Sequence, residues 1–456
     1  MSGWVHLTAR VPTLTLTTDP TRMHALASAA ALTFLKKPPP PPPPPQPTSP
    51  PIAPETVLAI FACWVLPVVL RLVLNRKRAL TVKARSLKPN EIMMGAIWIG
   101  PGGGPKGDGD RPDPGQSNAD ATIEAALRHG VREFDTAPWY GSGASEERLG
   151  RAIVNAGTKA AEARITTKAG RLFREPDGTP ALAGFDKPKL RGVALSPSKL
   201  GRTRLMERRC VNDFSAEGAR TSLAESLARM GLPRVHGLRM HDPNDNSNNR
   251  RGMAGFVDEV AQALAPGGMV RALSDLREAG SVDEIGLGMN CNLEAHQGVP
   301  DEILRLLRRA PRGTFDSALL AGGWNLLTQA GMPCYAACEA AGVKVHVAGV
   351  FCSGLLVGGD TYAYKKAPPE MVERAQAWRA LAAKHGCSLP AVAIAFAALP
   401  VCVSRVVLGM ASSKQVDENM RWVAEAAKVP PAIWAEAKAA GLLGANVPIP
   451  PAADMK

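Results

Sequence analysis

From Ile92 onward the sequence alternates between short apolar runs and longer runs with apolar residues at helical spacing. "RITTKAG" has the length of a strand, whereas "SAEGARTSLAESLARMG" repeats apolar residues as the buried face of a helix does. About eight such strand–helix pairs follow one another. Parallel strands joined by helices form an α/β fold, and eight pairs predict a closed (β/α)8 TIM barrel. A doubly wound open sheet is the alternative.

The strands are expected within eight segments: 92–100, 131–138, 164–170, 234–242, 282–290, 314–322, 343–351 and 404–410. A helix is predicted to begin at Ser145, with Ser145 as its N-cap and glutamates in its first turn. Two long loops are expected, at about 171–215 and 242–255. The first is very basic, and its composition favours a solvated surface excursion over a lid for an anionic substrate.

The first 88 residues differ in composition from the rest of the chain. Residues 1–54 form a low-complexity arm, similar to a transit peptide, which ends in a polyproline spacer. Residues 55–88 contain the apolar run 57–74, just long enough to span a bilayer, and a basic flank. This run is interpreted as a membrane anchor, as part of a targeting sequence, or as a dispensable extension. The compartment is therefore open between cytoplasm, organelle and membrane surface.

The remaining domain boundaries place the barrel at 89–446 and a short tail at 447–456, and we expect the barrel to fold without residues 1–88. The oligomeric state cannot be inferred. The net charge of +13 is concentrated at the N-terminus, where residues 1–91 hold 11 basic and 3 acidic residues. The rest of the chain is nearly balanced and has no aromatic residues among basic clusters, so a nucleic-acid partner is not expected.

Four ionisable side chains lie at or near the ends of predicted strands: Asp135, Tyr140, Lys168 and His241. Because the active sites of such barrels form where strands end, these side chains are expected to converge at one mouth. A buried lysine beside the phenol would favour the phenolate, a carboxylate would balance the lysine, and a histidine would orient a substrate oxygen. The group suits proton transfer at an alcohol or a carbonyl.

Hydride transfer would need a cofactor, because these side chains cannot carry it out alone. No Gly-x-Gly-x-x-Gly follows a strand in a βαβ setting, so a Rossmann cofactor domain is not expected. A metal site is not expected either. Cys334 and Cys338 share a helix face but have no nearby histidine, and they are interpreted as small buried residues.

Three segments carry a resemblance to a known family: "FDTAPWYGSGASEERLGRAI", the lysine of "RITTKAG", and "SLAESLARMGLPRVHGLRMHDPND". They resemble the aldo-keto reductases, and more narrowly the aldose dehydrogenase branch with its L-galactose and pyridoxal dehydrogenases. "IGLGMN", "GVFCSGLLVGG" and "VVLGMASSKQVDENMRWV" resemble the same branch. The resemblance covers about residues 92–446 and implies a (β/α)8 barrel that binds a nicotinamide dinucleotide across its C-terminal mouth.

The resemblance also implies roles for residues. The catalytic tetrad of the family falls on Asp135, Tyr140, Lys168 and His241, and Trp139 is placed at the wall of the sugar pocket. Asn290 matches the residue that holds the nicotinamide carboxamide. The other implied cofactor contacts are Phe351, Ser353 and Leu355 in the pyrophosphate loop and Gly409, Ser412, Gln415, Glu418 and Asn419 in the adenosine loop.

Departures from the family pattern concern the cofactor. Gly409 and Gln415 align with a lysine and an arginine that neutralise the 2′-phosphate in NADP-preferring members. NAD is therefore the expected cofactor. NADP is the alternative, because Lys414 lies next to Gln415 in the sequence. Ala321 and Ala348 stand where the broader family has a glutamine and an aromatic residue around the nicotinamide.

The function implied is oxidation of an aldose at C1 to the lactone by hydride transfer, with Tyr140 as the general base, for a sugar of the L-galactose, L-fucose or D-arabinose type. Pyridoxal oxidation and NADPH-dependent reduction of aldehydes or ketones are the enzymatic alternatives. The non-enzymatic alternative is a membrane-tethered sensor that binds a dinucleotide.

Overall fold

The computed structural model describes residues 80–101, 113–182, 208–244, 257–291 and 299–451. The chain divides into two compact units, Met1–Arg76 and Lys77–Lys456. The first unit lies outside the described residues, as do the predicted polyproline spacer and the apolar run 57–74. The predicted boundaries of the arm and the apolar segment therefore stay predictions.

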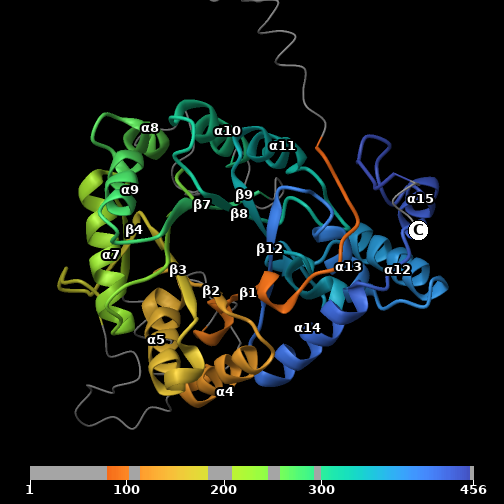
Figure 1. Cartoon of the computed structure of the whole chain (residues 1–456), viewed down its shortest axis with the longest axis horizontal. Coiled ribbons are helices and arrows are strands. Elements are labelled where there is room, and N and C mark those ends of the chain that lie inside the picture. The colour runs from red at the N-terminus through yellow and green to blue at the C-terminus, as the bar shows by residue number, and fades with distance from the viewer. Residues whose placement is uncertain (1–79, 102–112, 183–207, 245–256, 292–298, 452–456) are drawn as a thin grey trace, which may run out of the picture. The chain divides into compact units, whose positions relative to one another are not determined.

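Eight parallel strands close into a barrel in the order β1-β12-β9-β8-β7-β6-β3-β2 (Figure 1). This confirms the predicted TIM barrel over the open sheet. Every strand lies inside the segment predicted for it, except that β12 begins one residue earlier. The strands are β1 Ile92–Gly95, β2 Glu133–Asp135, β3 Arg164–Ala169, β6 Gly237–His241, β7 Glu284–Asn290, β8 Ser317–Ala321, β9 Lys344–Ala348 and β12 Val403–Gly409.

Helices surround the barrel (Figure 1). They are α4 Gly115–Arg128, α5 Ala144–Ala156, α7 Ala216–Met230, α8 Glu259–Leu264, α9 Met269–Glu278, α10 Val299–Arg309, α11 Met332–Ala341, α12 Pro369–Lys384, α13 Leu389–Ala397, α14 Ser413–Ala426 and α15 Ala432–Ala439. The last of these was not expected from the sequence.

The expectation of an irregular loop over 171–215 is wrong at both ends of that segment. Strand β4 (Arg171–Arg174) pairs with β5 (Arg209–Asn212) in an antiparallel ribbon, Arg171 opposite Asn212. Residues 183–207 between these strands lie outside the described residues. A second small ribbon, β10 (Thr361–Tyr362) with β11 (Lys365–Lys366), follows β9.

Helix α5 begins at Ala144, after Gly143 in the left-handed conformation, and Ser145 is not its N-cap. The Ser145 hydroxyl instead donates a hydrogen bond to the Ala96 carbonyl (2.7 Å) and lies 3.0 Å from the Thr136 hydroxyl. The serine therefore ties the start of α5 to the segments after β1 and β2. The N-cap prediction failed because the buried Ser145 hydroxyl bonds to groups distant in the sequence and not to the backbone N–H groups of the first helical turn.

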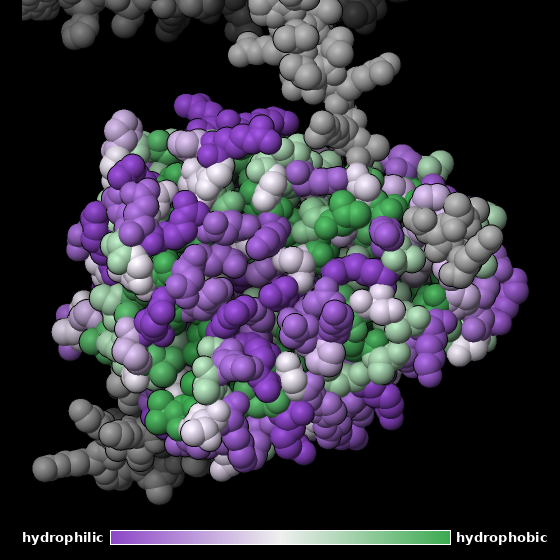
Figure 2. Space-filling view, in the orientation of Figure 1, coloured by the Kyte–Doolittle hydropathy of each residue, from purple (hydrophilic) through white to green (hydrophobic). Residues whose placement is uncertain are grey.

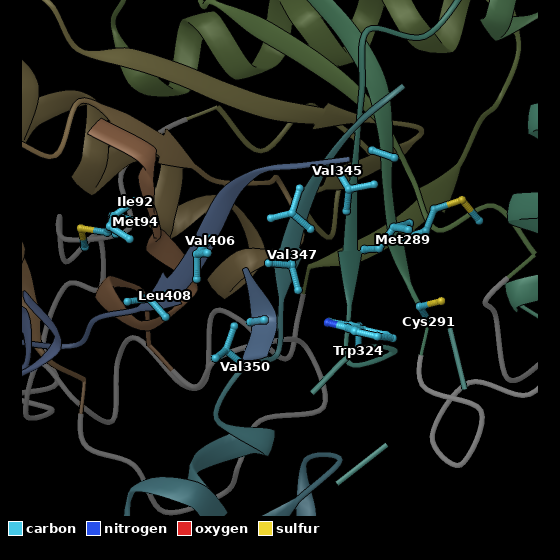
Figure 3. Packing of buried hydrophobic residues seen from close by; sticks show 14 of the residues in the cluster. Ile92, Met94, Met289, Cys291, Trp324, Val345, Val347, Val350, Val406 and Leu408 are labelled. Carbon is cyan, nitrogen blue, oxygen red and sulfur yellow. The ribbon is translucent and has the colours of Figure 1, made fainter. Parts of the chain in front are cut away.

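The hydrophobic core lies mainly between the barrel and its helices, as Figure 3 shows for residues of β1, β9 and β12. A second, small cluster consists of Met93, Leu319, Ala348 and Val407, which come from four strands. The surface in the orientation of Figure 1 is mostly hydrophilic, with smaller apolar areas between (Figure 2). The predicted burial of Cys334 and Cys338 in α11 is confirmed.

No single helix among the described residues is long and apolar enough to cross a membrane; only α12 and α13 taken together, bent by 98°, reach that length and composition.

Residues 80–87 pack on the barrel unit ahead of the predicted boundary at residue 89. Val82 forms an antiparallel bridge with Pro400, and the Lys83 amide donates to the Leu399 carbonyl (2.8 Å). Arg85 donates to the Val403 carbonyl (2.9 Å) and pairs with Glu91 (2.7 Å). These contacts fix the segment against the start of β12.

A truncated protein that begins at Lys77 is therefore expected to melt at the temperature of the full chain. One that begins at Pro89 loses the bridge, the Arg85 contacts and the buried Leu80, and should melt several degrees lower. Thermal unfolding of the three proteins checks this. Equal melting temperatures would show that the barrel needs nothing before residue 89.

Candidate active site

The carboxyl ends of the barrel strands bring the predicted catalytic side chains together. Asp135 is the last residue of β2, His241 the last of β6 and Asn290 the last of β7, while Lys168 lies one residue before the end of β3. The register places Lys168 beside Arg239 and His241 beside Gly288. Active sites of such barrels form at this end, because the strand ends and the loops that follow them meet there.

Lys168 is the centre of the site. Its Nζ donates to Asp135 Oδ2 at 2.5 Å, to the Thr136 carbonyl at 2.9 Å and to the Tyr140 hydroxyl at 3.0 Å. Its side chain is 1% exposed, and burial lowers its pKa while Asp135 opposes that shift. The three contacts use all three protons of an ammonium group. The lysine is thus held in one position, against the phenol.

Tyr140 lies in the turn that connects β2 to α5. The next residue, Gly141, has a positive φ of 60°. The expected lowering of the Tyr140 pKa is wrong. Burial raises this pKa well above 10, and the negative charges of Asp135 and Asp242 add to the rise. Arg239 and Arg171 oppose it only in part. Tyr140 is therefore a phenol at neutral pH.

His241 is a neutral imidazole. Burial lowers its pKa well below the usual value, and the charges of Arg171 and Lys168 add to this. The ring meets the Tyr140 ring edge-on, with centroids 6.0 Å apart. Its Nδ1 is buried without a hydrogen-bond partner among the described residues. Such an atom needs a partner, which a bound ligand would supply.

Asp242 and Arg171 belong to the site and were not predicted. Asp242, with a positive φ of 44°, accepts hydrogen bonds from the Asn290 amide (2.7 Å) and from its side-chain Nδ2 (3.0 Å). Arg171 donates to the carbonyls of His241 (3.3 Å) and Asp242 (3.1 Å), and lies 4.6 Å from the Trp139 ring centre. Their positions in the sequence could have indicated this: Asp242 directly follows His241, and Arg171 directly follows the segment "TKAG" at the end of β3.

Trp139 lies beside Tyr140 in the chain, and its place at the wall of a sugar pocket stays a prediction. Its indole also contacts Phe173, with centroids 5.8 Å apart. Arg171 and Phe173, both from β4, hold the ring in place. An aromatic surface fixed next to the proton donor suits an uncharged substrate that presents C–H groups as well as hydroxyls.

The residues expected to bind a dinucleotide fit such a ligand. Asn290 is held by Asp242 through its side-chain amide, so its remaining carbonyl oxygen can accept from a carboxamide. In the segment after β9, Cys352, Ser353 and Gly354 have positive φ angles of 51°, 58° and 106°. Turns of this kind gather backbone N–H groups on one side and suit a pyrophosphate.

Other expected cofactor residues lie around β12 and α14. Ser412 is the N-cap of α14, with its hydroxyl accepting from the Gln415 amide (3.3 Å), and Asn419 donates to the Gly409 carbonyl (3.2 Å). Glu418 pairs with Lys414 at 4.0 Å. Phe351 meets Trp422 edge-on and Leu355 is buried. The structure brings these segments to the same barrel end as the tetrad.

The two alanines that depart from the family pattern, Ala321 and Ala348, are paired at the ends of β8 and β9. Neither can stack on or donate to a nicotinamide ring through its side chain. No group of three or more His, Cys, Asp or Glu residues in the described part of the chain is arranged to hold a metal ion.

Comparisons with known proteins agree with this geometry. The model of the aldo/keto reductase family matches residues 99–436. D-threo-aldose 1-dehydrogenase of Pseudomonas sp is 32% identical over 330 residues, 71% of this chain and 88% of that protein. Pyridoxal 4-dehydrogenase of Microbacterium luteolum is 30% identical over 72% of this chain and 89% of its own length. L-galactose dehydrogenase of Arabidopsis thaliana is 27% identical over 74% and 86%.

Among solved structures, the glycerol dehydrogenase of Gluconobacter oxydans superposes with a TM-score of 0.50 at 18% identity, over 82% of this chain and 98% of that one. This similarity supports the fold.

Gly288 of β7 leaves the space that Lys168 occupies. A Cβ at this position would lie 2.9 Å from Lys168 Cε and 3.0 Å from its Cδ. We expect Gly288→Ala to displace Nζ from the Tyr140 hydroxyl and to lower kcat about 10-fold or more, because small misplacements of catalytic groups are costly. Steady-state kinetics and a crystal structure check this. Gly280→Ala is the control: this turn glycine has open space around it but a positive φ of 71°, so the substitution strains the backbone away from the site and should lower the melting temperature without changing kcat.

Proposed function

Because the chain belongs to the aldo/keto reductase family of NAD(P)-dependent oxidoreductases acting on small molecules, we propose that it oxidises the C1 hydroxyl of an aldose to the lactone. The observation that supports this best is the buried Lys168–Asp135 pair held 3.0 Å from the Tyr140 hydroxyl, with a neutral His241 beside it. This arrangement can move one proton at one oxygen.

Each residue of the tetrad has a separate role in this proposal. In oxidation the Tyr140 phenolate would accept the proton of the substrate hydroxyl as hydride leaves C1, and in reduction the phenol would donate the proton. Lys168 stabilises the phenolate that forms when the proton leaves, since its Nζ already donates to that oxygen. Asp135 holds Lys168, and the neutral imidazole of His241 orients the same substrate oxygen. Because these residues work equally in both directions, reduction of an aldehyde uses the same geometry.

A bound nicotinamide dinucleotide would supply the hydride acceptor at C1. Asn290 would hold its carboxamide, the segment around Ser353 its pyrophosphate, and Ser412 with Asn419 its adenosine end. These assignments follow the resemblance and the fit described above.

Two observations support this substrate class. Relatives at about 30% identity act on D-threo-aldoses and on pyridoxal, as their names state, and the relative from Arabidopsis acts on L-galactose. In this chain Trp139 lies beside the proton donor and is fixed by Arg171 and Phe173, which suits a sugar ring. Pyridoxal oxidation and general carbonyl reduction are the alternatives.

A sensor that only binds the dinucleotide is the non-enzymatic alternative. Turnover of L-galactose, L-fucose, D-arabinose or pyridoxal with NAD⁺ separates these functions. Tight binding of the dinucleotide with no turnover in the panel would favour the sensor.

A preference for NAD has support from Gly409. A Cβ at this position would lie 2.8 Å from Cδ1 and Nε1 of Trp98, so a lysine could not replace this glycine unless the indole moved. Gln415 is uncharged, and its side-chain oxygen accepts from the Ala411 amide (2.7 Å). Lys414 is 84% exposed and lies 4.0 Å from Glu418, which offsets its charge.

Tyr140→Phe is expected to lower kcat by about 10²- to 10⁴-fold while the dinucleotide Kd stays the same, because only the proton donor is lost. For the wild-type protein, kcat for oxidation should rise with pH from about 7 to about 9.5, since burial keeps Tyr140 protonated. Stopped-flow kinetics and binding titrations check both expectations. Retention of most activity by Tyr140→Phe would remove this residue from the reaction.

Gln415→Arg should improve kcat/KM with NADP⁺ about 10-fold relative to NAD⁺, because it adds a charge-assisted bond to the 2′-phosphate. Gln415→Met, which adds no charge, is the control. A wild-type protein with equal kcat/KM for the two cofactors would contradict the preference for NAD.

A further inference from the structure

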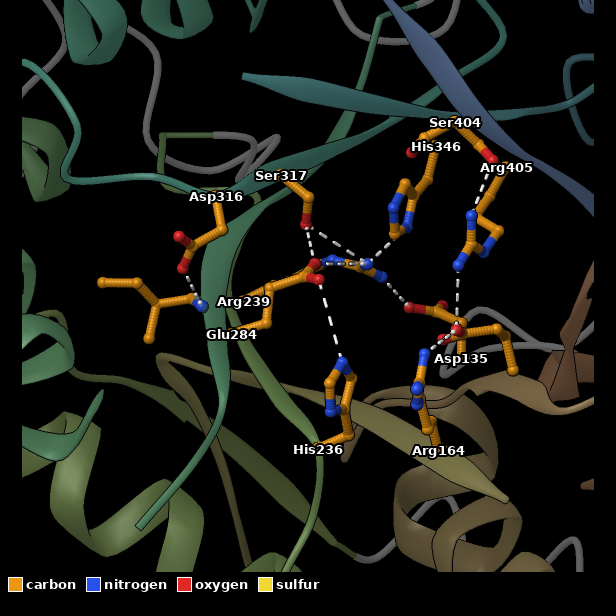
Figure 4. Close-up of polar contacts among 12 residues, drawn as sticks. Asp135, Arg164, His236, Arg239, Glu284, Asp316, Ser317, His346, Ser404 and Arg405 are labelled. Atoms are coloured by element: carbon orange, nitrogen blue, oxygen red, sulfur yellow. Dashed lines mark hydrogen bonds and ion pairs between the residues drawn. The ribbon is translucent and has the colours of Figure 1, made fainter. Parts of the chain in front are cut away.

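Asp135 is shared between two buried cations. Lys168 donates to its Oδ2 at 2.5 Å. Arg239 Nη1 donates to its Oδ1 at 2.7 Å (Figure 4). The Arg239 side chain is only 1% exposed. Arg239 comes from β6, two residues before His241, and alternate residues of a strand share a face. The arginine therefore points into the barrel below the tetrad.

The other side of the guanidinium is anchored across the barrel. Nη2 of Arg239 donates to His346 Nδ1 at 2.6 Å and to the Ser317 hydroxyl at 3.5 Å, and it lies 3.8 Å from Glu284. The Ser317 hydroxyl in turn donates to Glu284. Because arginine has only donors, His346 Nδ1 is an acceptor and its ring is neutral. Burial and the charges of Arg239 and Arg405 keep its pKa well below the usual value.

The polar groups near Arg239 come from five other strands: Asp135 of β2, Lys168 of β3, Glu284 of β7, Ser317 of β8 and His346 of β9. Arg405 of β12 and His236 act on the same His346, and His236 also lies 3.8 Å from Glu284. Asp135 and Glu284 balance Lys168 and Arg239. Removal of one member of a buried ionic group leaves its partner uncompensated. Arg239 thus connects the far side of the barrel to the carboxylate that holds the lysine.

We propose that Arg239 is a positioning residue that fixes the Asp135 carboxylate so that one oxygen faces Lys168, and thereby keeps the lysine at the Tyr140 hydroxyl. Without it, Oδ1 of Asp135 loses a charged donor and the carboxylate is free to rotate or to draw Nζ away from the phenol. Its positive charge also opposes the rise of the Tyr140 pKa. The proposal rests on the role of Tyr140 as proton donor.

The test compares Arg239→Met, Arg239→Lys and Arg405→Met with the wild-type full chain. Arg405 is a suitable control because it is another arginine of the barrel strands, bound to Glu133 at 3.1 Å instead of Asp135. For Arg239→Met we expect kcat to fall 10-fold or more, with KM and dinucleotide Kd within threefold. The rise of oxidation kcat with pH should shift to higher pH. Arg239→Lys, which keeps the charge, should restore the pH profile and part of kcat.

Crystal structures of the variants supply a readout that does not depend on activity. In Arg239→Met we expect the Lys168–Asp135 or Lys168–Tyr140 contact to lengthen, and in Arg405→Met both should stay. An unchanged kcat and pH profile in Arg239→Met would overturn the proposal. The proposal would also be overturned if kcat fell in Arg239→Met and in Arg405→Met in the same proportion to the fall in melting temperature. That result would show that Arg239 only stabilises the fold.

If Arg239→Met does not fold, His346→Leu removes the acceptor that anchors the guanidinium. Its kcat should fall at least threefold with the same shift in pH, and unchanged values would overturn the proposal. Measuring Tyr140→Phe in parallel separates a failure of the positioning role of Arg239 from a failure of the role of Tyr140 in proton transfer. If it stays active, the proton-donor role fails while the crystal structures still test whether Arg239 fixes Asp135.

Discussion

The ion pair between Lys168 and Asp135 is the interaction on which the site depends. Both side chains are almost completely buried, and taking two charges out of water costs several kcal/mol per ion unless the geometry and further hydrogen bonds compensate. Here the Thr136 carbonyl, the Tyr140 hydroxyl and Arg239 supply those bonds. The barrel offers room for them because Gly288 leaves space beside the lysine.

Burial has opposite consequences for the members of the tetrad. It keeps Tyr140 protonated and His241 neutral, so both can face a neutral substrate oxygen at physiological pH. The same burial destabilises the phenolate that oxidation needs. Lys168 is the group positioned to offset that cost, and Arg171 and Arg239 add positive charge nearby. The network of arginines is thus part of the chemistry as well as of the packing.

Much of this could be predicted from the sequence, because strand ends in a (β/α)8 barrel converge whatever the details of packing. Asp135, Lys168 and His241 lie at such ends and the structure brings them together. Contacts that depend on tertiary packing could not be predicted. Arg239 has an ordinary place in an apolar strand, and only the closed barrel puts it against Asp135. Ser145 follows a helix-start pattern yet binds the Ala96 carbonyl, and the β4–β5 ribbon has no clear periodicity.

The rate of hydride transfer in Lys168→Met tests the central claim most directly. The substitution keeps a flexible, unbranched side chain, one atom shorter than lysine, and removes the ammonium group that holds Tyr140 and Asp135. The account predicts a single-turnover rate lower by about 10²- to 10⁴-fold, with dinucleotide Kd unchanged. A rate within threefold of the wild-type protein would contradict it, because the buried pair would then contribute nothing to the proton transfer.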